Sequence, residues 1–213
     1  MNEFTKRLFT SLVILIPTFF IIFYGGFLFI IFLAIIFLLT LYEWLNLCEN
    51  KIILFLGIAV LISSFSAMFY LRRIDLYLLL FIMIISISSD IGGYMFGKLF
   101  KGPKLTKISP NKTYSGMIGS YVFTLSIGTS YILYSNSLLI IPEIDYSLFE
   151  IVLIMLILSS INQIGDIILS YFKRLKKVKD TGRLLPGHGG LLDRIDGLIF
   201  SILAGYLLKI LII

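Results

Sequence analysis

The sequence predicts an all-α, polytopic integral membrane protein with about seven transmembrane helices and a cytoplasmic N-terminus. Of its 213 residues, 59% are hydrophobic and 14% are charged, whereas a soluble domain is about half apolar and about a quarter charged. The apolar residues form runs close to the roughly 20 residues that cross a bilayer core. The single Cys48 excludes an internal disulfide and a cysteine metal cluster.

Seven apolar runs follow one another along the chain. They cover about residues 8–24, 27–47, 52–71, 76–97, 116–135, 148–171 and 197–213. Gly25 and Gly26 form the expected turn after the first run. Tyr42, Glu43 and Trp44 close the second run and are expected at the membrane interface.

The basic residues predict the orientation. A cytoplasmic N-terminus puts fifteen of the eighteen Lys and Arg residues on the cytoplasmic side, as the positive-inside rule requires. Only Arg72 and Arg73 fall on the other side, and Lys209 lies in the last run. The basic segments 98–113 and 173–196 therefore face the cytoplasm, and their charge favours anionic head groups or phosphates over nucleic acid.

Polar residues in the sixth run are the first candidates for chemistry. Asn162, Asp166 and Ser170 are spaced by four, and Lys173 continues the same helical face. A carboxylate in the bilayer costs about 2.5–3.5 kcal/mol, so Asp166 is expected to meet a partner or a wet cavity. The alternative is an Asp166 that is solvated at the interface or paired with Lys173.

Two further carboxylates, Asp193 and Asp196, share a helical face at the start of the last run. Together with Asp166 they would form the oxygen-rich kind of site that hard cations such as Mg²⁺ prefer. The alternative is helix capping, because Asp is favourable near a helix N-terminus.

Between these carboxylates lies a segment that mixes basic residues, glycines and the one histidine, His188. Lys and Arg neutralise phosphate oxygens, and glycines allow the backbone to approach a ligand closely. The alternative is a positive-inside anchor beside a glycine-rich turn.

A second cluster begins in the fourth run. Asp90, Gly93 and Gly97 follow a helical stride, and this small face would also permit pairing of two copies as a homodimer. The following turn offers hydroxyl and ammonium groups to an anion. The alternative is a helix-packing face followed by an ordinary basic loop. The anion-binding candidates in this turn are Ser109, Lys112 and Thr113.

Residues 170–196 resemble the signature of the phosphatidate cytidylyltransferases, also called CDP-diacylglycerol synthases. The fixed positions of that pattern are filled by Ser170, Lys173, Arg174, Lys179, Asp180, Gly182, Pro186, His188, Gly189, Gly190, Asp193, Arg194 and Asp196. The resemblance covers about residues 86–197, although Asn111 and Ser115 stand where the family usually has a lysine and an acidic residue. We therefore expect N-terminal helices over 1–75, compact for the family, and a catalytic transmembrane region over 76–213.

The resemblance implies transfer of CMP from CTP to phosphatidic acid, giving CDP-diacylglycerol and pyrophosphate for phospholipid biosynthesis. It places the protein in the inner membrane with its active site facing the cytoplasm. The expected catalytic residues are Asp166, Lys173, Asp193 and Asp196. The expected substrate-binding residues are Ser109, Lys112, Thr113, Ser170, Arg174, Lys179, Asp180, His188, Gly189, Gly190 and Arg194. The expected Mg²⁺ ligands are Asp166, Asp193 and Asp196, with Asp90 as a further candidate and room for a second cation.

Two other interpretations stay open. A related CTP-dependent enzyme could act on a polyprenyl or ether-lipid phosphate, or on a lipid alcohol, with the same active-site residues. A cation-coupled transporter could use Asp90 and Asp166, but it would leave the signature at 170–196 unexplained.

Overall fold

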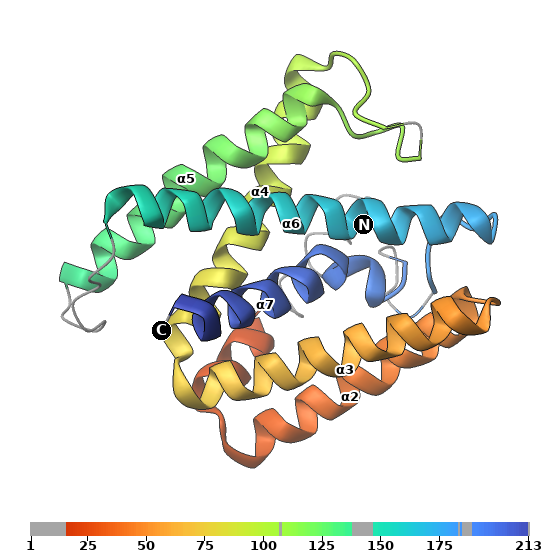
Figure 1. The fold of residues 1–213 in the computed structure, drawn as a ribbon, viewed down its shortest axis with the longest axis horizontal. Helices are drawn as coiled ribbons and strands as arrows, with labels where there is room; N and C mark the ends of the chain where they lie inside the picture. The colour runs from red at the N-terminus through yellow and green to blue at the C-terminus, as the bar shows by residue number, and fades with distance from the viewer. Residues whose placement is uncertain (1–15, 107, 138–146, 183, 185–188, 213) are drawn as a thin grey trace, which may run out of the picture. The chain divides into compact units, whose positions relative to one another are not determined.

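The computed structural model describes residues 16–106, 108–137, 147–182, 184 and 189–212. Residues 16–24 are helical, and six longer helices follow them (Figure 1). Their bounds are α2 Gly26–Leu47, α3 Lys51–Ile74, α4 Leu76–Phe100, α5 Tyr114–Ser137, α6 Leu148–Leu175 and α7 Leu192–Ile212. Outside the helices, one antiparallel bridge joins Lys104 to Thr113. The described chain is therefore all-α.

Five of the described helices, α2 to α6, are long and apolar enough to cross a membrane. Helix α7 corresponds to the run expected over 197–213 but is not among these five. The run expected over 8–24 is helical over its described part, 16–24. The prediction of an all-α polytopic membrane protein is confirmed.

Helices α6 and α7 extend beyond the apolar runs that predicted them and take in predicted site residues. Helix α6 continues four residues past 171 to Leu175, so Lys173 and Arg174 lie in its last turn. Helix α7 begins at Leu192 instead of 197, so Asp193 lies in its first turn. Cations near a helix C-terminus and anions near an N-terminus are favourable. The charged ends therefore continue the helices instead of terminating them.

The chain forms two compact units, each of which combines segments that are distant in sequence. The first unit contains residues Met1–Ile74 and Phe172–Ile195, and the second contains Asp75–Tyr171 and Asp196–Ile213.

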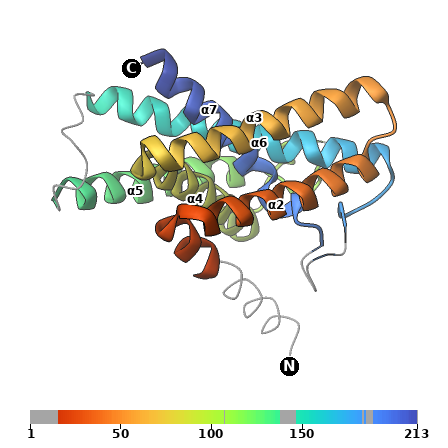
Figure 2. The same ribbon diagram turned by 90° about the horizontal axis from the view of Figure 1, so that it is seen from below.

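In the first unit, α2 and α3 pack side by side, as Figures 1 and 2 show. The indole N–H of Trp44 donates to the carbonyl of Leu54 at 3.0 Å. A Cβ at Gly57 would lie 2.0 Å from the Trp44 ring, so only glycine fits there. The ring of Phe172 meets Trp44 edge-on at 5.2 Å between centroids. Glu43 and Trp44 are buried within the protein, 3% and 5% exposed, so both side chains contact protein partners. Their position at the membrane interface stays a prediction.

Arg72, which the predicted orientation places on the side opposite most basic residues, has a structural role. Its guanidinium donates to the carbonyl of Ile22 and, at 2.9 Å, to that of Phe23. These carbonyls end the helix over 16–24, just before the turn at Gly25, where φ is +70° (Figure 2). The last carbonyls of a helix lack partners within it. Arg72 therefore satisfies them from α3.

In the second unit, α4 and α5 pack closely through glycines. A Cβ at Gly92 would lie 2.3 Å from the carbonyl oxygen of Gly119, and one at Gly93 would lie 2.7 Å from Ser120 Oγ. Gly97 faces Thr113 in the same way, at 3.2 Å. The small-residue face of α4 is thus a packing face within the chain. A homodimer stays a prediction, and this face no longer argues for it.

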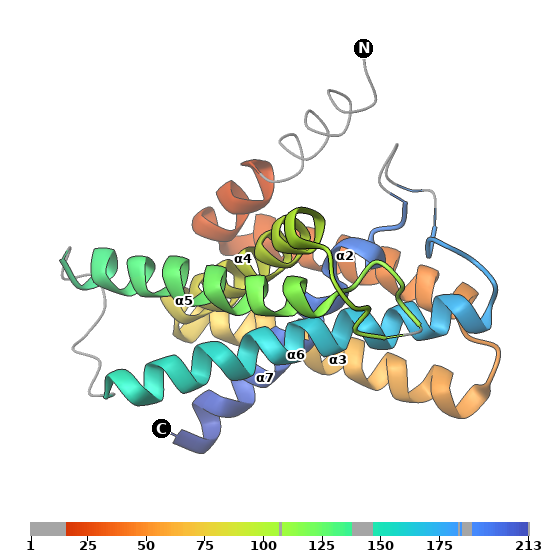
Figure 3. The same ribbon diagram turned by 90° about the horizontal axis from the view of Figure 1, so that it is seen from above.

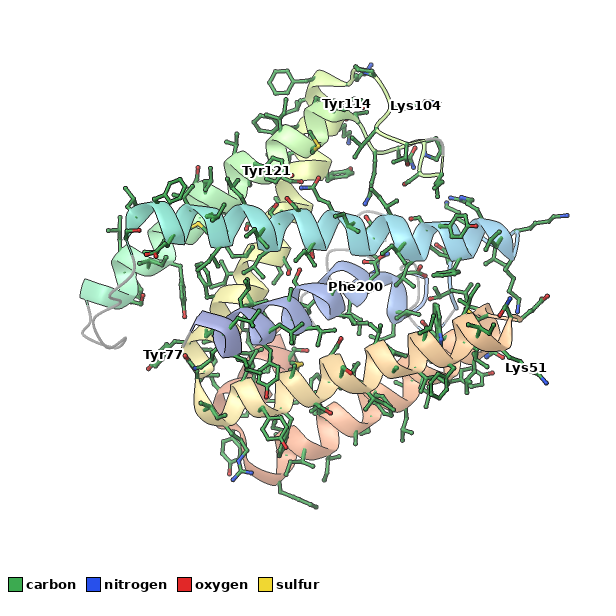
Figure 4. The ribbon with its side chains drawn as sticks, viewed as in Figure 1. Lys51, Tyr77, Lys104, Tyr114, Tyr121 and Phe200 are labelled. Carbon is green, nitrogen blue, oxygen red and sulfur yellow. The ribbon has the colours of Figure 1, made fainter. Side chains whose placement is uncertain are left out.

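Asp75 begins α4. Its carboxylate accepts the amide of Leu78 at 2.9 Å and forms an ion pair with Lys209 at 2.7 Å. The pair gives Lys209, the one basic residue of the last apolar run, a charged partner inside the second unit. Phe200 of α7, labelled in Figure 4, packs on Gly165 of α6, where a Cβ would lie 2.5 Å from its ring.

Candidate functional site

The predicted site residues fall into two groups, one in each compact unit. We call them the signature-loop cluster, in the first unit, and the α4–α6 cluster, in the second. The signature-loop cluster comprises Lys173, Arg174, Lys179, Asp180, Gly189, Gly190, Asp193 and Arg194. The α4–α6 cluster comprises Asp90, Ser109, Lys112, Thr113, Asp166, Ser170 and Asp196. His188 lies outside the described residues.

Asp193 is the centre of the signature-loop cluster. Its Oδ1 accepts the ammonium group of Lys173 at 2.7 Å. Its Oδ2 accepts the amide and hydroxyl of Thr181, at 2.8 and 3.1 Å, and the amide of Gly190 at 3.1 Å. The side chain is only 7% exposed. Both carboxylate oxygens are therefore engaged by protein donors in this arrangement.

Lys173 reaches Asp193 because α6 continues past the apolar run. Its side chain is 11% exposed, so two opposite charges are withdrawn from water together. Replacing one residue of such a pair by an uncharged one is strongly destabilising, because the charge of the other residue stays buried without a partner. The alternative in which Asp166 pairs with Lys173 is not what the structure shows: the partner of Lys173 is Asp193.

The glycines of the loop lie close to these carboxylates and leave room for them. Gly189 has φ +83°, a left-handed conformation that glycine adopts without strain. A Cβ there would lie 3.1 Å from Asp180 Cβ and 3.2 Å from Asp193 Oδ2. The side chains of Arg174, Lys179 and Arg194 are exposed. The loop thus combines a buried ion pair with exposed basic groups suited to anionic phosphates.

Sequence reasoning missed Glu43 as a member of this cluster. Its carboxylate accepts the amides of Leu191 and Leu192 and the hydroxyl of Thr181. The sequence did contain a signal for Glu43, because it is an acidic residue in an apolar run. A charged side chain in a bilayer is costly unless it meets partners.

In the α4–α6 cluster, Asp166 is paired with Lys112. Their charged atoms lie 2.7 Å apart, and the side chains are 35% and 21% exposed. The ammonium group of Lys112 also donates to the carbonyl of Gln163 at 3.1 Å, which brings the 101–113 loop against α6 (Figure 3). Ser170 donates to the other Asp166 oxygen at 3.3 Å. The expected partner of Asp166 is therefore supplied by the loop after α4.

Asp90 lies on α4 and accepts the side-chain amide of Asn162 at 2.7 Å. Asn162 is fully buried, and its Oδ1 has no hydrogen-bond partner among the described residues. A buried acceptor without a donor is rare. This oxygen faces Gly197, where a Cβ would lie 2.4 Å from it, while the amide nitrogen faces Asp90. The carboxylates of Asp90 and Asp166 are hard oxygen ligands of the kind that Mg²⁺ prefers. The oxygen chemistry of this cluster therefore fits the expected metal.

The metal ligands themselves stay a prediction. Among the described residues, no group of three or more His, Cys, Asp and Glu side chains lies together as a metal site would require. Asp196 belongs to the second unit, with its Oδ1 accepting the amide of Gly197 at 2.9 Å. Asp193 belongs to the first.

The predicted anion-binding turn at 109–116 is ordered by its own hydrogen bonds. The amide of Lys112 donates to the carbonyl of Ser109 at 3.0 Å. Thr113 accepts the amide of Gly116 at 3.1 Å and so caps the N-terminus of α5. Lys104 and Tyr114, labelled in Figure 4, lie at this end of the second unit, whereas Tyr121 lies farther along α5 and bonds Ser160 of α6 at 2.9 Å. Whether Ser109 and Thr113 bind substrate stays a prediction.

Comparison with known proteins shows which family the chain resembles. The model of the cytidylyltransferase family matches residues 49–211. A phosphatidate cytidylyltransferase of Rickettsia conorii is 36% identical over 178 residues, 79% of this chain and 74% of that protein. One of Staphylococcus saprophyticus is 36% identical over 146 residues, 68% of this chain and 54% of that protein. One of Brucella suis is 41% identical over 130 residues, 61% of this chain and 45% of that protein.

The chain spans about half the length of the staphylococcal and Brucella proteins, 54% and 45%. The matched region contains α3 to α6, all of α7 except its last residue, and both clusters. On the evidence of that match, the chain belongs to the cytidylyltransferase family.

Proposed function

We propose that this protein transfers CMP from CTP to phosphatidic acid, giving CDP-diacylglycerol and pyrophosphate. The observation that carries the proposal is the match over residues 49–211, which includes the whole signature loop. The relatives that share it at 36–41% identity are phosphatidate cytidylyltransferases. A cation-coupled transporter would have no use for this loop.

The reaction makes one bond and breaks one. A phosphate oxygen of phosphatidic acid attacks the α-phosphorus of CTP, and the bond from that phosphorus to the β-phosphate oxygen breaks. Pyrophosphate leaves with the electron pair. Because the lipid phosphate is already anionic, it needs no strong general base. The main requirements are neutralisation of two mutually repelling anions and their alignment.

The residues of the signature-loop cluster meet the first requirement. Arg174, Lys179 and Arg194 are exposed and would contact phosphate oxygens. Lys173 is kept in place by Asp193 at 2.7 Å, so its charge is fixed before substrate arrives. Fixed charges stabilise a transition state without a cost of reorganisation.

Carboxylates would bind the metal that such reactions use. We propose Asp166, Asp193 and Asp196 as Mg²⁺ ligands, with Asp90 as a further oxygen donor for the same or a second cation. A bound Mg²⁺ would neutralise phosphate charge and orient the triphosphate. Lys112, now paired with Asp166, would be released to bind a phosphate when a cation takes that carboxylate.

The orientation follows from charge. The helices α2 to α6 are long and apolar enough to cross a membrane, and the basic segments 98–113 and 173–196 lie among them in the sequence. The positive-inside rule assigns these segments to the cytoplasm. We therefore propose that the protein lies in the inner membrane with its active site on the cytoplasmic side, where CTP is available.

The test uses the full chain in membranes or nanodiscs, with CTP labelled in its α-phosphate, Mg²⁺ and phosphatidic acid. The expected product is a labelled lipid that co-migrates with CDP-diacylglycerol and requires all three components. Parallel reactions with polyprenyl phosphate and with diacylglycerol test the other lipid acceptors. Absence of any labelled lipid would overturn the proposal, and a product from polyprenyl phosphate alone would reassign the substrate.

A further inference from the structure

Glu43 is a buried carboxylate on a helix that the family match does not include. It lies near the end of α2, outside residues 49–211, and is 3% exposed. A carboxylate in an apolar environment is costly unless hydrogen bonds satisfy it. Its partners therefore show why the fold tolerates it.

Both oxygens of Glu43 accept hydrogen bonds from the signature loop and the start of α7. Oε1 accepts the amide of Leu191 at 2.9 Å. Oε2 accepts the amide of Leu192 and the hydroxyl of Thr181, both at 2.8 Å. The first amides of a helix have no partner within it, and negative charge is favourable there. Glu43 thus caps α7 from a helix about 148 residues earlier in the chain.

Two glycines of the signature loop make room for this carboxylate. A Cβ at Gly182 would lie 2.7 Å from Oε1, and a Cβ at Gly190 would lie 2.5 Å from Oε2. Such distances are too short for a real Cβ. These two glycines therefore allow the loop to close on Glu43.

Thr181 connects Glu43 to Asp193. Its hydroxyl lies 2.8 Å from Glu43 Oε2, while its amide donates to Asp193 Oδ2 at 2.8 Å. Asp193 in turn binds Lys173 at 2.7 Å. Glu43 and Asp193 thus fix the same short segment from two sides.

We propose that Glu43 is a positioning residue for the proposed reaction. It holds Thr181, Leu191 and Leu192 against α2 and thereby keeps Asp193 in the geometry in which it binds Lys173. This inference rests on the proposed function for its catalytic consequence, but the ordering of the loop can be measured independently.

The test compares Glu43→Gln and Thr181→Val with two controls. Thr40→Val removes another buried hydroxyl of α2, whose hydrogen bonds go only to its own helix, to Ile36 and Phe37. Thr181→Ser keeps the hydroxyl. The full chain in nanodiscs is examined by hydrogen exchange and by a CTP titration of CDP-diacylglycerol formation.

We expect the amides of Leu191 and Leu192 to exchange at least tenfold faster in Glu43→Gln than in wild type, with α4 and α5 unchanged. We expect kcat/KM for CTP to fall at least tenfold in Glu43→Gln and Thr181→Val. Thr40→Val should keep both values, and Thr181→Ser should recover most of the loss.

Unchanged exchange at Leu191 and Leu192 in Glu43→Gln would overturn the inference. So would faster exchange throughout the protein, which indicates general destabilisation, or faster local exchange with an unchanged kcat/KM. If wild type itself makes no CDP-diacylglycerol, the proposed function fails, and with it the catalytic role of Glu43. The exchange rates of Leu191 and Leu192 then still decide whether Glu43 orders the loop.

Discussion

The ammonium group of Lys173 lies 2.7 Å from Oδ1 of Asp193, and this pair joins the last turn of α6 to the first turn of α7. Both residues belong to the first compact unit. Because both side chains are almost fully buried, neither charge can be removed without leaving the other unpaired.

Replacing Lys173 by methionine should therefore destabilise the protein as well as inactivate it. We expect the free energy of unfolding to fall by about 3 kcal/mol, the lower end for a broken buried pair, because Asp193 keeps three other donors. Thermal unfolding in detergent measures this. The control is Lys51→Met, since Lys51 is exposed at the start of α3 and projects outward in Figure 4. An unchanged unfolding midpoint in Lys173→Met would contradict the role of the pair.

Asp193→Asn should abolish formation of CDP-diacylglycerol in protein that still folds, although the unpaired Lys173 lowers its stability. Asparagine has nearly the same shape and keeps one acceptor oxygen, but it removes the charge that binds Lys173 and that a metal would require. The assay is the labelled-CTP reaction, with recovery of folded protein measured by size exclusion. Glu49→Gln is the control, because the Glu49 side chain is 86% exposed. Activity of Asp193→Asn near that of wild type would show that the metal assignment is wrong.

The pair of Lys112 and Asp166 should show measurable coupling. In a double-mutant cycle with Lys112→Ala and Asp166→Ala, we expect a coupling free energy of about 1 kcal/mol, because the pair is only partly exposed. Unfolding of the purified protein without nucleotide or divalent cation gives this value. Additive effects of the two substitutions would indicate that the ion pair does not form in the membrane.

Gly119→Ala should weaken the packing of α4 on α5. The added Cβ would lie 2.3 Å from Phe96 Cβ and 2.6 Å from the carbonyl oxygen of Gly92, and neither atom can move without its helix. Overpacking of this kind costs about 1–3 kcal/mol, measured as a lower thermal midpoint. Ser130→Ala on α5 is the control, since that hydroxyl is exposed and bonds only its own helix at Ser126. Equal midpoints for the two variants would refute the close approach.

Cys48 should react slowly with iodoacetamide at neutral pH. Burial raises the pKa of its thiol to about 11, and the positive charge of Lys176 opposes this only in part. A free cysteine has a pKa of about 8.5, so at pH 8 the thiolate of Cys48 should be roughly 200-fold less abundant. The alkylation rate should rise about tenfold per pH unit up to the pKa. Lys176→Met should slow it further, whereas a faster rate in that variant would contradict the assigned cause.

Much of the fold could be predicted from local sequence. A bilayer core requires long apolar helices, so the apolar runs predicted α2 to α6 within a few residues. The helix ends were less predictable. Lys173 and Asp193 lie inside helices because charge at a helix end is favourable there, which hydropathy does not report.

The site was predicted in part. The spacing of Asp166 and Ser170 on one helical face is confirmed by their hydrogen bond. Their partner Lys112 comes from a loop 54 residues earlier than Asp166, and no local pattern links the two. The glycines of α4 illustrate the opposite case. The stride of Gly93 and Gly97 left a ligand site, a dimer face and a helix-packing face open, and in the structure Gly93 packs on α5 beside Gly92.

The sequence by itself thus determined the membrane class, the helical segments and the residues of the signature, because each depends on composition or on spacing within one segment. Only the tertiary structure decided which charges meet. Asp193 binds Lys173, and Glu43 binds Leu191 and Leu192. Such contacts satisfy buried polar groups. Which partner a buried group meets depends on how helices distant in sequence pack, and the order of residues along one helix carries no information on that packing.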